Sequence, residues 1–212
     1  MQIEIKIIES QIRIEIETIE EYFKLIEDSI SSVYKSHSQS LNKKLEILEE
    51  EDAQRYYETH IDEVFKLREI MPSYHRYSIF LLIYNFFEHN LNMLCVICEK
   101  QIKNDISLKD LSGKGIHKSK LYLTKIMKYT EAFRDIKWNT FLFYNELRNI
   151  IVHNGSFVSE QNKELPKKIA IHSGVTISSY RTILFKREFI ENYLLDIKEF
   201  FDLLFTEIKT SK

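Results

Sequence analysis

The chain contains 212 residues, 44% of them hydrophobic, which is enough for one domain with a substantial core or for one domain with a helical extension. Its 4 glycines and 2 prolines are very few for this length, which excludes a fold of many short strands and favours long helices. The net charge of −2 is unevenly divided, because residues 1–70 carry 17 acidic and 9 basic side chains whereas residues 71–212 carry 15 acidic and 21 basic.

Residues 1–70 are expected to form an acidic helical extension. An apolar residue recurs every seven positions in its first half, a spacing typical of an amphipathic helix with a coiled-coil-like seam. These residues are Ile5, Ile12, Ile19, Ile26 and Val33. We expect the Ser-rich stretch Ser29–Ser40 to break this helix, and a second helix to run from Leu41 to Ile70 and end before Pro72. The seam either mediates oligomerisation or folds back on the rest of the chain.

Residues 73–212 are expected to form a helical bundle. Its first helix, from Ser73 to about Lys103, is apolar on nearly all sides, as is typical of a helix at the centre of a bundle. The most apolar run, Tyr77–Phe87, is too short to span a bilayer, so we expect no membrane contact. Glu88 follows among apolar helical neighbours, where a carboxylate needs a partner.

Cys95 and Cys98 form a single Cys-x-x-Cys pair within the same helix. No second pair completes the four ligands of a zinc site, and a redox pair would open a helix after a strand. We interpret them as reduced core cysteines, which suits a cytoplasmic protein.

Lysines are concentrated in residues 100–128, where we expect a loop and then a helix from Lys118 to about Phe133. A cationic segment attracts polyanions through counterion release. The lysines that we single out as candidate contacts to a polyanion are Lys114, Lys118, Lys120 and Lys125. A solvated, lysine-rich surface without a ligand is the alternative interpretation.

Two further helices are expected, one rich in aromatic residues from Trp138 to Gly155 and one from Lys186 to Ile208. Between them, residues 168–172 and 175–178 flank the turn Ser173-Gly174 and predict a β-hairpin. The expected fold is therefore all-α: an up-and-down helical bundle with a long N-terminal helical extension and a small β-hairpin inserted before the last helix.

Residues 146–156, at the end of the aromatic helix, carry the most informative side chains. Arg148 and His153 stand five positions apart, Asn149 follows the Arg, and Asn154 follows the His. An Arg can hold a phosphate in bidentate fashion, and a His can transfer protons near neutral pH. In RNA cleavage, His153 would take the proton of the ribose 2′-hydroxyl, and Arg148 would stabilise the pentacoordinate phosphate. Their offset of about 140° on a helix makes them flank a groove.

The residue types alone leave a second interpretation of this motif open. An Arg and a His near a helix C-terminus also interact favourably with the helix dipole and cap its last carbonyls. The sequence lacks a cluster of Asp and Glu of the kind that a two-metal nuclease needs. We therefore expect neither a metal nor another cofactor.

The segment from Arg148 to His153, RNIIVH in one-letter code, resembles the Arg-polar-x-x-x-His signature of the HEPN-domain ribonucleases. The residues on either side, 146–147 and 154–155, are similar to those that flank the motif in that family. The helix that contains residues 86–91 resembles the early core helix of the abortive-infection members. The resemblance covers about residues 73–208 and leaves out the N-terminal 70 residues and the hairpin.

This resemblance implies a HEPN-like bundle and a metal-independent endoribonuclease that leaves 2′,3′-cyclic phosphate and 5′-hydroxyl ends on RNA. It implies a homodimer in which two motifs meet in one composite active site. Arg148 would hold the scissile phosphate, His153 would transfer protons, and Asn149 would orient both. It further implies a toxin or antiviral defence effector with an antitoxin or defence protein as partner.

Two supporting residues are added from this chain itself. Glu88 is a candidate ion-pair partner that positions Arg148, although a surface position on a less buried face is equally open. Asn154 is the second, beside His153. Two other functions also remain open: a non-catalytic HEPN-like module that binds RNA, a nucleotide or a partner, and a structural oligomerisation protein that uses the N-terminal seam.

Overall fold

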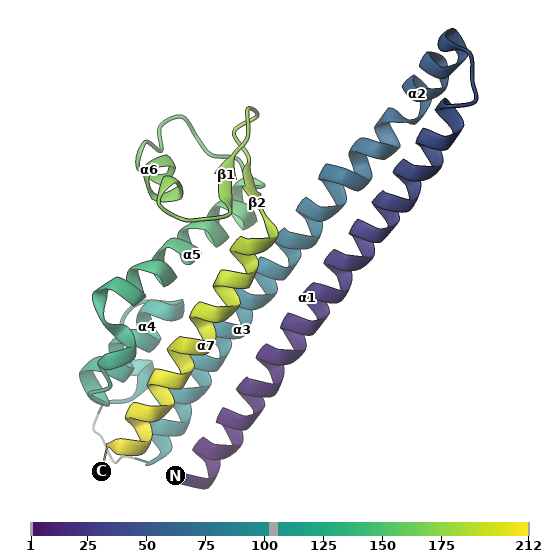
Figure 1. The fold of residues 1–212 in the computed structure, drawn as a ribbon. Helices are drawn as coiled ribbons and strands as arrows, with labels where there is room; N and C mark the ends of the chain where they lie inside the picture. The colour runs from purple at the N-terminus through teal and green to yellow at the C-terminus, as the bar shows by residue number, and fades with distance from the viewer. Residues whose placement is uncertain (1, 102–105, 212) are drawn as a thin grey trace.

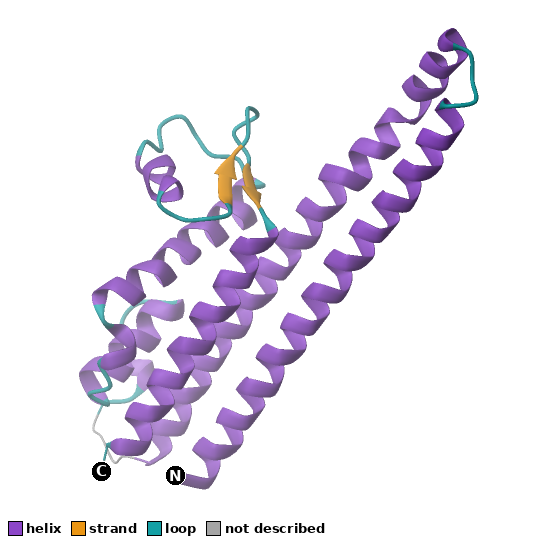
Figure 2. Ribbon diagram, in the orientation of Figure 1, coloured by secondary structure: helices purple, strands orange, loops and turns teal. Residues whose placement is uncertain are grey.

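The structure is a computed structural model that describes residues 2–101 and 106–211. Its helices are α1 (Gln2–Leu45), α2 (Glu50–Phe65), α3 (Met71–Gln101), α4 (Gly115–Leu121), α5 (Asp135–Asn154), α6 (Glu164–Ala170) and α7 (Arg187–Thr210). Strands β1 (Val175–Ile177) and β2 (Ile183–Phe185) form an antiparallel hairpin directly before α7. The expected all-α fold with a small hairpin before the last helix is therefore confirmed (Figure 2).

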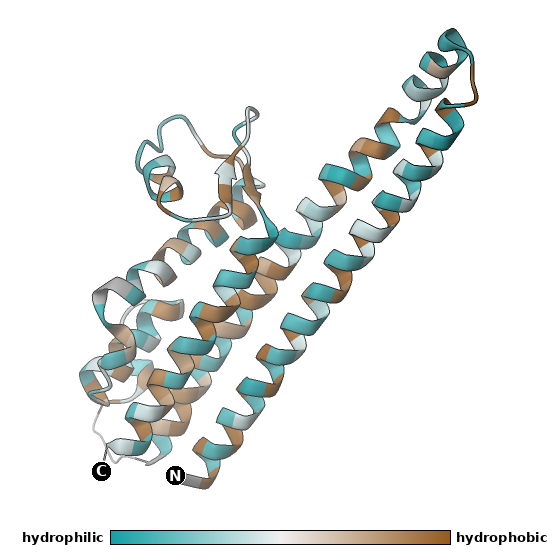
Figure 3. Cartoon of the chain, in the orientation of Figure 1, coloured by the Kyte–Doolittle hydropathy of each residue, from teal (hydrophilic) through white to brown (hydrophobic). Residues whose placement is uncertain are grey.

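Long helices dominate the arrangement, with α1 and α5 running in one direction and α3 and α7 in the other (Figure 1). α1, α3 and α7 pack against one another, and α5 packs on α3. Beyond this bundle, the second half of α1 and all of α2 continue as a two-helix arm, which we define as residues 29–70 (Figure 1). Figure 3 shows hydrophobic residues gathered between the helices of the bundle and a mostly hydrophilic arm tip.

The core of the bundle is aromatic. The Phe87 ring of α3 stacks on Phe141 of α5 with ring centroids 4.4 Å apart, and it meets Phe200 of α7 edge-on at 5.1 Å. Tyr144 of α5 similarly lies 3.9 Å from the Tyr193 ring of α7. Burying such rings removes large apolar areas from water, worth about 25 cal/mol per Å². α5 is thus anchored by its aromatic face to both α3 and α7.

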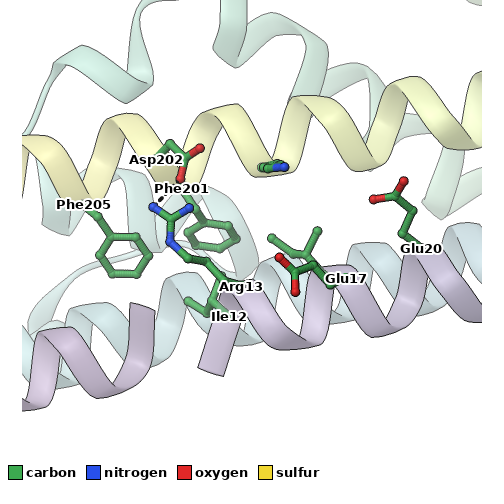
Figure 4. A pocket seen from close by; sticks show the side chains of 9 residues that line it. Ile12, Arg13, Glu17, Glu20, Phe201, Asp202 and Phe205 are labelled. Atoms are coloured by element: carbon green, nitrogen blue, oxygen red, sulfur yellow. Dashed lines mark ion pairs between the residues drawn. The ribbon is translucent and has the colours of Figure 1, made fainter. Parts of the chain in front are cut away.

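The first half of α1 belongs to the same core, because its apolar row folds back on α3 and α7. The buried residues of this row are Ile5, Ile8, Ile12, Ile16, Ile19 and Phe23. Figure 4 shows a hollow between α1 and α7 where Ile12 faces Phe201 and Phe205, beside an ion pair of 2.7 Å between Arg13 and Asp202. Of the two alternatives for the seam, folding back is the one found for this half.

A buried ion pair marks the root of the arm. Arg76 of α3 donates two hydrogen bonds of 2.8 Å to the carboxylate of Glu27 on α1, which is 7% exposed. A third nitrogen of Arg76 donates to the carbonyl of Phe185 at the end of β2. Three segments far apart in the sequence are therefore joined at one guanidinium.

Two predicted helix boundaries are wrong. α1 continues through Ser29–Ser40 to Leu45, because a serine within a helix can bond back to the preceding turn, as the Ser29 hydroxyl does to the Leu25 carbonyl at 2.7 Å. Pro72 lies inside a continuous helix. The preceding residues, Lys66–Ile70, form a wider π-helical turn, which accommodates a residue that lacks a backbone N–H.

The predicted hairpin is shifted along the chain. Residues 164–170 form α6, and the strands that pair are 175–177 and 183–185, with Val175 opposite Phe185. The turn lies at residues 178–182, where a hydrogen-bonded Ser178 and Thr182 replace the expected Ser173-Gly174 turn.

The helix predicted for residues 118–133 starts at Gly115 and continues as a π-helical segment to Ile126. It ends there because Lys128 adopts a left-handed φ of 64°. A separate 3₁₀ turn covers Glu131–Phe133. The predicted end of the first bundle helix at Lys103 lies outside the described residues.

The central helix is longer than the apolar run Tyr77–Phe87 indicated. Residues 50–100 form one continuous helix that is long and apolar enough to cross a membrane by length and composition. Within its most apolar window, 56% is buried inside the protein, and the core helix of a soluble protein passes the same test.

Candidate functional site

α5 presents the Arg-His motif at the end of an anchored helix. Trp138, Phe141, Tyr144 and Leu147 bury one face of α5, so the remaining face of its last turns is free to carry polar side chains. The helix ends at Gly155, whose φ of 56° is the left-handed conformation of a C-terminal cap, with its N–H bonded to the Ile150 carbonyl.

Arg148 is turned toward α3. Its guanidinium carbon lies 5.6 Å from the centre of the Tyr84 ring, within the range of a cation–π contact. The Tyr84 hydroxyl donates a 2.7 Å hydrogen bond to the side-chain oxygen of Asn145, one turn before Arg148 on α5. Tyr84 therefore holds the guanidinium from one side and ties α3 to α5 on the other.

Only some of the hydrogen-bond donors of Arg148 have a partner among the described residues. One terminal nitrogen donates to the side-chain oxygen of the adjacent Asn149 at 3.1 Å. The Nε atom is buried and has no partner in the part of the chain that the structure describes. An anion that reached this side of the guanidinium would meet an unsatisfied donor.

His153 lies on the exposed side of the same helix end. Its side chain and those of Asn149 and Asn154 are exposed, and no hydrogen bond or ion pair joins His153 to another described residue. Arg148 and His153 thus occupy different sides of α5, as their five-residue offset predicts. The motif therefore presents a guanidinium and an imidazole on different sides of one helix end, without closing a site around either.

Glu88 does not pair with Arg148: among the described residues, no ion pair joins the two side chains. The Glu88 carboxylate instead lies against the start of α4, where a Cβ added to Gly115 would stand 2.7 Å from its Oε1 atom. Burial, and then the Glu88 charge, raise the pKa of the Tyr84 hydroxyl to about 12, while Arg148 opposes the shift. Glu88 thus lies close enough to raise the pKa of Tyr84, but among the described residues it forms no ion pair with Arg148.

The four lysines do not gather around the motif. Lys114 and Lys125 are exposed and Lys118 is partly buried on α4 and its continuation, whereas Lys120 lies 4.9 Å above the Trp138 ring near the start of α5. Trp138 and His153 are about 22 Å apart along the helix at 1.5 Å per residue. The lysine-rich surface and the motif therefore lie toward opposite ends of α5 (Figure 1).

The segment after α5 contains side chains that the sequence did not single out. Phe157, Tyr180 and Arg181 all belong to this segment and the hairpin turn, whose backbones lie side by side because residues 156–158 bond to residues 181–183. Tyr84 and Asn145 were missed as well. A spacing of four residues places Tyr84 on the same helix face as Glu88, and Asn145 on the same face as Asn149. Nothing in the sequence indicates that these two faces pack against each other.

Among residues 2–101 and 106–211, no group of three or more His, Cys, Asp or Glu side chains is arranged to hold a metal ion. Cys95 and Cys98 are buried, and burial raises the pKa of their thiols to about 12 and about 11. A thiol with a raised pKa is a poor nucleophile at neutral pH. The motif on α5 remains the strongest candidate site.

Comparison of the chain with models of known protein families, with characterised proteins and with solved structures gives no match. The motif and its surroundings are therefore the features of the molecule that indicate a function.

Proposed function

We propose that the protein is a metal-independent endoribonuclease of the HEPN class. The observation that carries the proposal is the end of α5, where a partly buried Arg148 held over Tyr84 is followed by an exposed His153 and a left-handed Gly155. An oriented guanidinium and an exposed imidazole are groups that can stabilise the phosphate and move the proton in cleavage at a ribose 2′-hydroxyl.

The reaction uses the substrate's own hydroxyl as nucleophile. His153 removes the proton from the 2′-oxygen, which attacks the adjacent phosphorus while Arg148 binds the non-bridging oxygens of the pentacoordinate phosphate. The bond between phosphorus and the 5′-oxygen then breaks, and that oxygen takes up a proton. The products are a 2′,3′-cyclic phosphate and a 5′-hydroxyl.

A second copy of the chain completes the site in this proposal. Arg148 faces α3 and His153 faces outward, so the motif of one copy surrounds only part of a phosphate. A homodimer that brings two α5 ends together would supply a second imidazole to protonate the leaving 5′-oxygen. We therefore expect activity to depend on protein concentration.

Mixed cellular RNA incubated with the purified protein tests this function. We expect fragments with cyclic phosphate and 5′-hydroxyl ends, and the same rate in excess EDTA. The matched variant is Arg148→Ala, which removes the phosphate contact. Cleavage that stops in EDTA, or fragments with 3′-hydroxyl ends, would contradict the proposal.

The proposed biological role is that of a cytoplasmic toxin or antiviral defence effector that a partner protein neutralises. Induced expression in a bacterial host should arrest growth for the wild type and leave growth unchanged for the His153→Ala variant. Equal toxicity of both proteins would contradict this role.

A non-catalytic RNA-binding module is the second candidate, and the distance of the lysines from the motif favours it. Lys114, Lys118 and Lys125 lie on or next to α4, near the start of α5, where they could bind RNA without involving His153. This candidate predicts RNA binding that the triple change of these lysines to Gln abolishes, and no RNA products.

A further inference from the structure

The short sheet that follows the motif helix presents exposed aromatic rings. After Gly155, the chain turns through Ser156 at a φ of 67° and runs antiparallel to the start of β2. The Ile183 N–H donates to the Ser156 carbonyl at 3.0 Å, and the Val158 N–H donates to the Arg181 carbonyl at 2.8 Å. Residues 156–158 thus lie beside the hairpin, joined to it by these two bonds and by one isolated antiparallel bridge between Phe157 and Thr182.

Phe157 points outward between two buried neighbours. Ser156 and Val158 are buried, whereas the Phe157 side chain is 47% exposed. Its N–H donates to the carbonyl of Asn154 at 3.0 Å, so this ring directly follows the turn that contains His153.

A second ring stands at the tip of the hairpin. Tyr180 is 85% exposed in a turn closed by Ser178 and Thr182, whose backbones bond at 2.9 Å and whose hydroxyls bond at 2.7 Å. Arg181 adopts a left-handed φ of 60° and donates from Nε to the Val158 carbonyl at 2.8 Å. The hydrogen bonds of the turn therefore hold Tyr180 in an outward position.

The region around these rings is cationic. Residues 148–186 carry six basic and two acidic side chains, a net charge of +4. The terminal nitrogens of Arg181 make no hydrogen bond to a described residue. Exposed rings on a hydrogen-bonded turn, with guanidinium nitrogens nearby that are only partly bonded, match the way in which single-stranded nucleic acids are bound. Bases stack on aromatic faces, and the nucleic-acid backbone follows positive charge.

We propose that Phe157 and Tyr180 form a base-stacking platform that selects single-stranded RNA for the motif on α5. This inference rests on the proposed function, and it adds the substrate class. Bases on either side of the scissile phosphate would stack on the two rings, while Arg181 contacts the backbone. A duplex binds poorly because its bases are already stacked on each other.

Binding is tested with the wild-type chain and a fluorescent 2′-O-methyl oligoribonucleotide, which lacks the hydroxyl needed for cleavage. Fluorescence anisotropy should show single-stranded binding that weakens about 5- to 100-fold in Phe157→Ala and Tyr180→Ala. Tyr180→Phe keeps the ring and should bind as the wild type does. Ile171→Ala is the matched control, because Ile171 is an 80% exposed aliphatic side chain of the same region.

Three results would overturn the inference: equal binding by the alanine variants, equal affinity for duplex, or a loss of self-association in Phe157→Ala, which would make this surface a contact between copies. Ring-dependent binding without any cleavage of natural RNA would refute the proposed ribonuclease while supporting the platform. Full cleavage activity in both ring variants would refute the platform while supporting the proposed ribonuclease.

Discussion

The two ends of α5 differ in what surrounds them. In the first half, Trp138, Phe141 and Tyr144 are buried among the rings of α3 and α7, whereas the last turn exposes Asn149 and His153 to solvent. The same helix therefore combines an anchor and a site. Substitutions in the first half should change stability, and substitutions in the last turns should change activity at little cost in stability.

The largest stability effect is expected at Phe141. Its ring stacks on Phe87 at 4.4 Å and meets Phe200 at 5.0 Å, so Phe141→Ala leaves a cavity and should lower the free energy of unfolding by about 3 to 5 kcal/mol. Val152→Ala, at a 47% exposed position of the same helix, should change it by less than about 0.5 kcal/mol. Urea unfolding measures both, and equal losses would refute the division of α5.

Arg148→Lys tests the geometry of the other end. A lysine keeps the charge but cannot offer two parallel donors to a phosphate or stack its head group flat on Tyr84, so RNA cleavage should slow by about 10- to 100-fold. The control is Arg134→Lys, just before the first residue of α5, where the exposed arginine pairs with Glu131 and cleavage should be unchanged. Equal rates for Arg148→Lys and wild type would show that only the charge matters.

A smaller effect is expected at the helix end. Gly155 has a φ of 56°, and no atom lies within 4 Å of the position that a Cβ would take, so Gly155→Ala adds backbone strain without a clash. The expected loss of unfolding free energy is about 1 to 2 kcal/mol. Gly155→Asn should cost less, because asparagine tolerates the left-handed region better. An Asn variant as unstable as the Ala variant would contradict this explanation.

The smallest expected effect is a pH dependence of stability, caused by a carboxyl group that contacts the first half of α5. The Tyr144 hydroxyl donates a 2.6 Å hydrogen bond to Asp196, yet burial dominates and raises the pKa of the Asp196 carboxyl. A raised carboxyl pKa favours the folded state below the unfolded pKa of about 3.9, and this contribution is lost as the pH rises through the folded pKa. Asp196→Asn should therefore gain stability relative to wild type as the pH rises from 4 toward 7. Thermal unfolding across this range measures the difference, and a constant offset would contradict the prediction.

Apolar periodicity predicted most of the long helices, because a row of apolar residues must be buried whatever its partner is. It located the end of α5 at Gly155 and the start of α7 near Lys186. The helix breaks predicted at Ser29–Ser40 and at Pro72 are wrong. At both places, continuous packing between α1 and the helix formed by residues 50–101 overrides the local signals for a break. Residue preferences are weak beside such tertiary contacts.

The candidate site was predictable only where it is local in sequence. Arg148, Asn149 and His153 lie on one helix, so their relative positions follow from helical geometry. The contacts made by α3 do not follow from the geometry of α5. Tyr84 approaches Arg148 from α3, and Glu88 faces Gly115 because the loop before α4 passes there. The positions of Phe157 and Tyr180 depend on a bridge from residue 157 to residue 182 and on a hairpin whose turn was predicted at Ser173-Gly174 instead of residues 178–182.

The most direct test of the account compares His153→Ala with wild type in the same preparation, by the rate of RNA cleavage and by thermal unfolding. His153 is exposed and makes no hydrogen bond to a described residue, so we expect an unchanged melting temperature and a cleavage rate lower by a factor of about 100 to 10,000. Full cleavage by the His153→Ala protein would contradict the account.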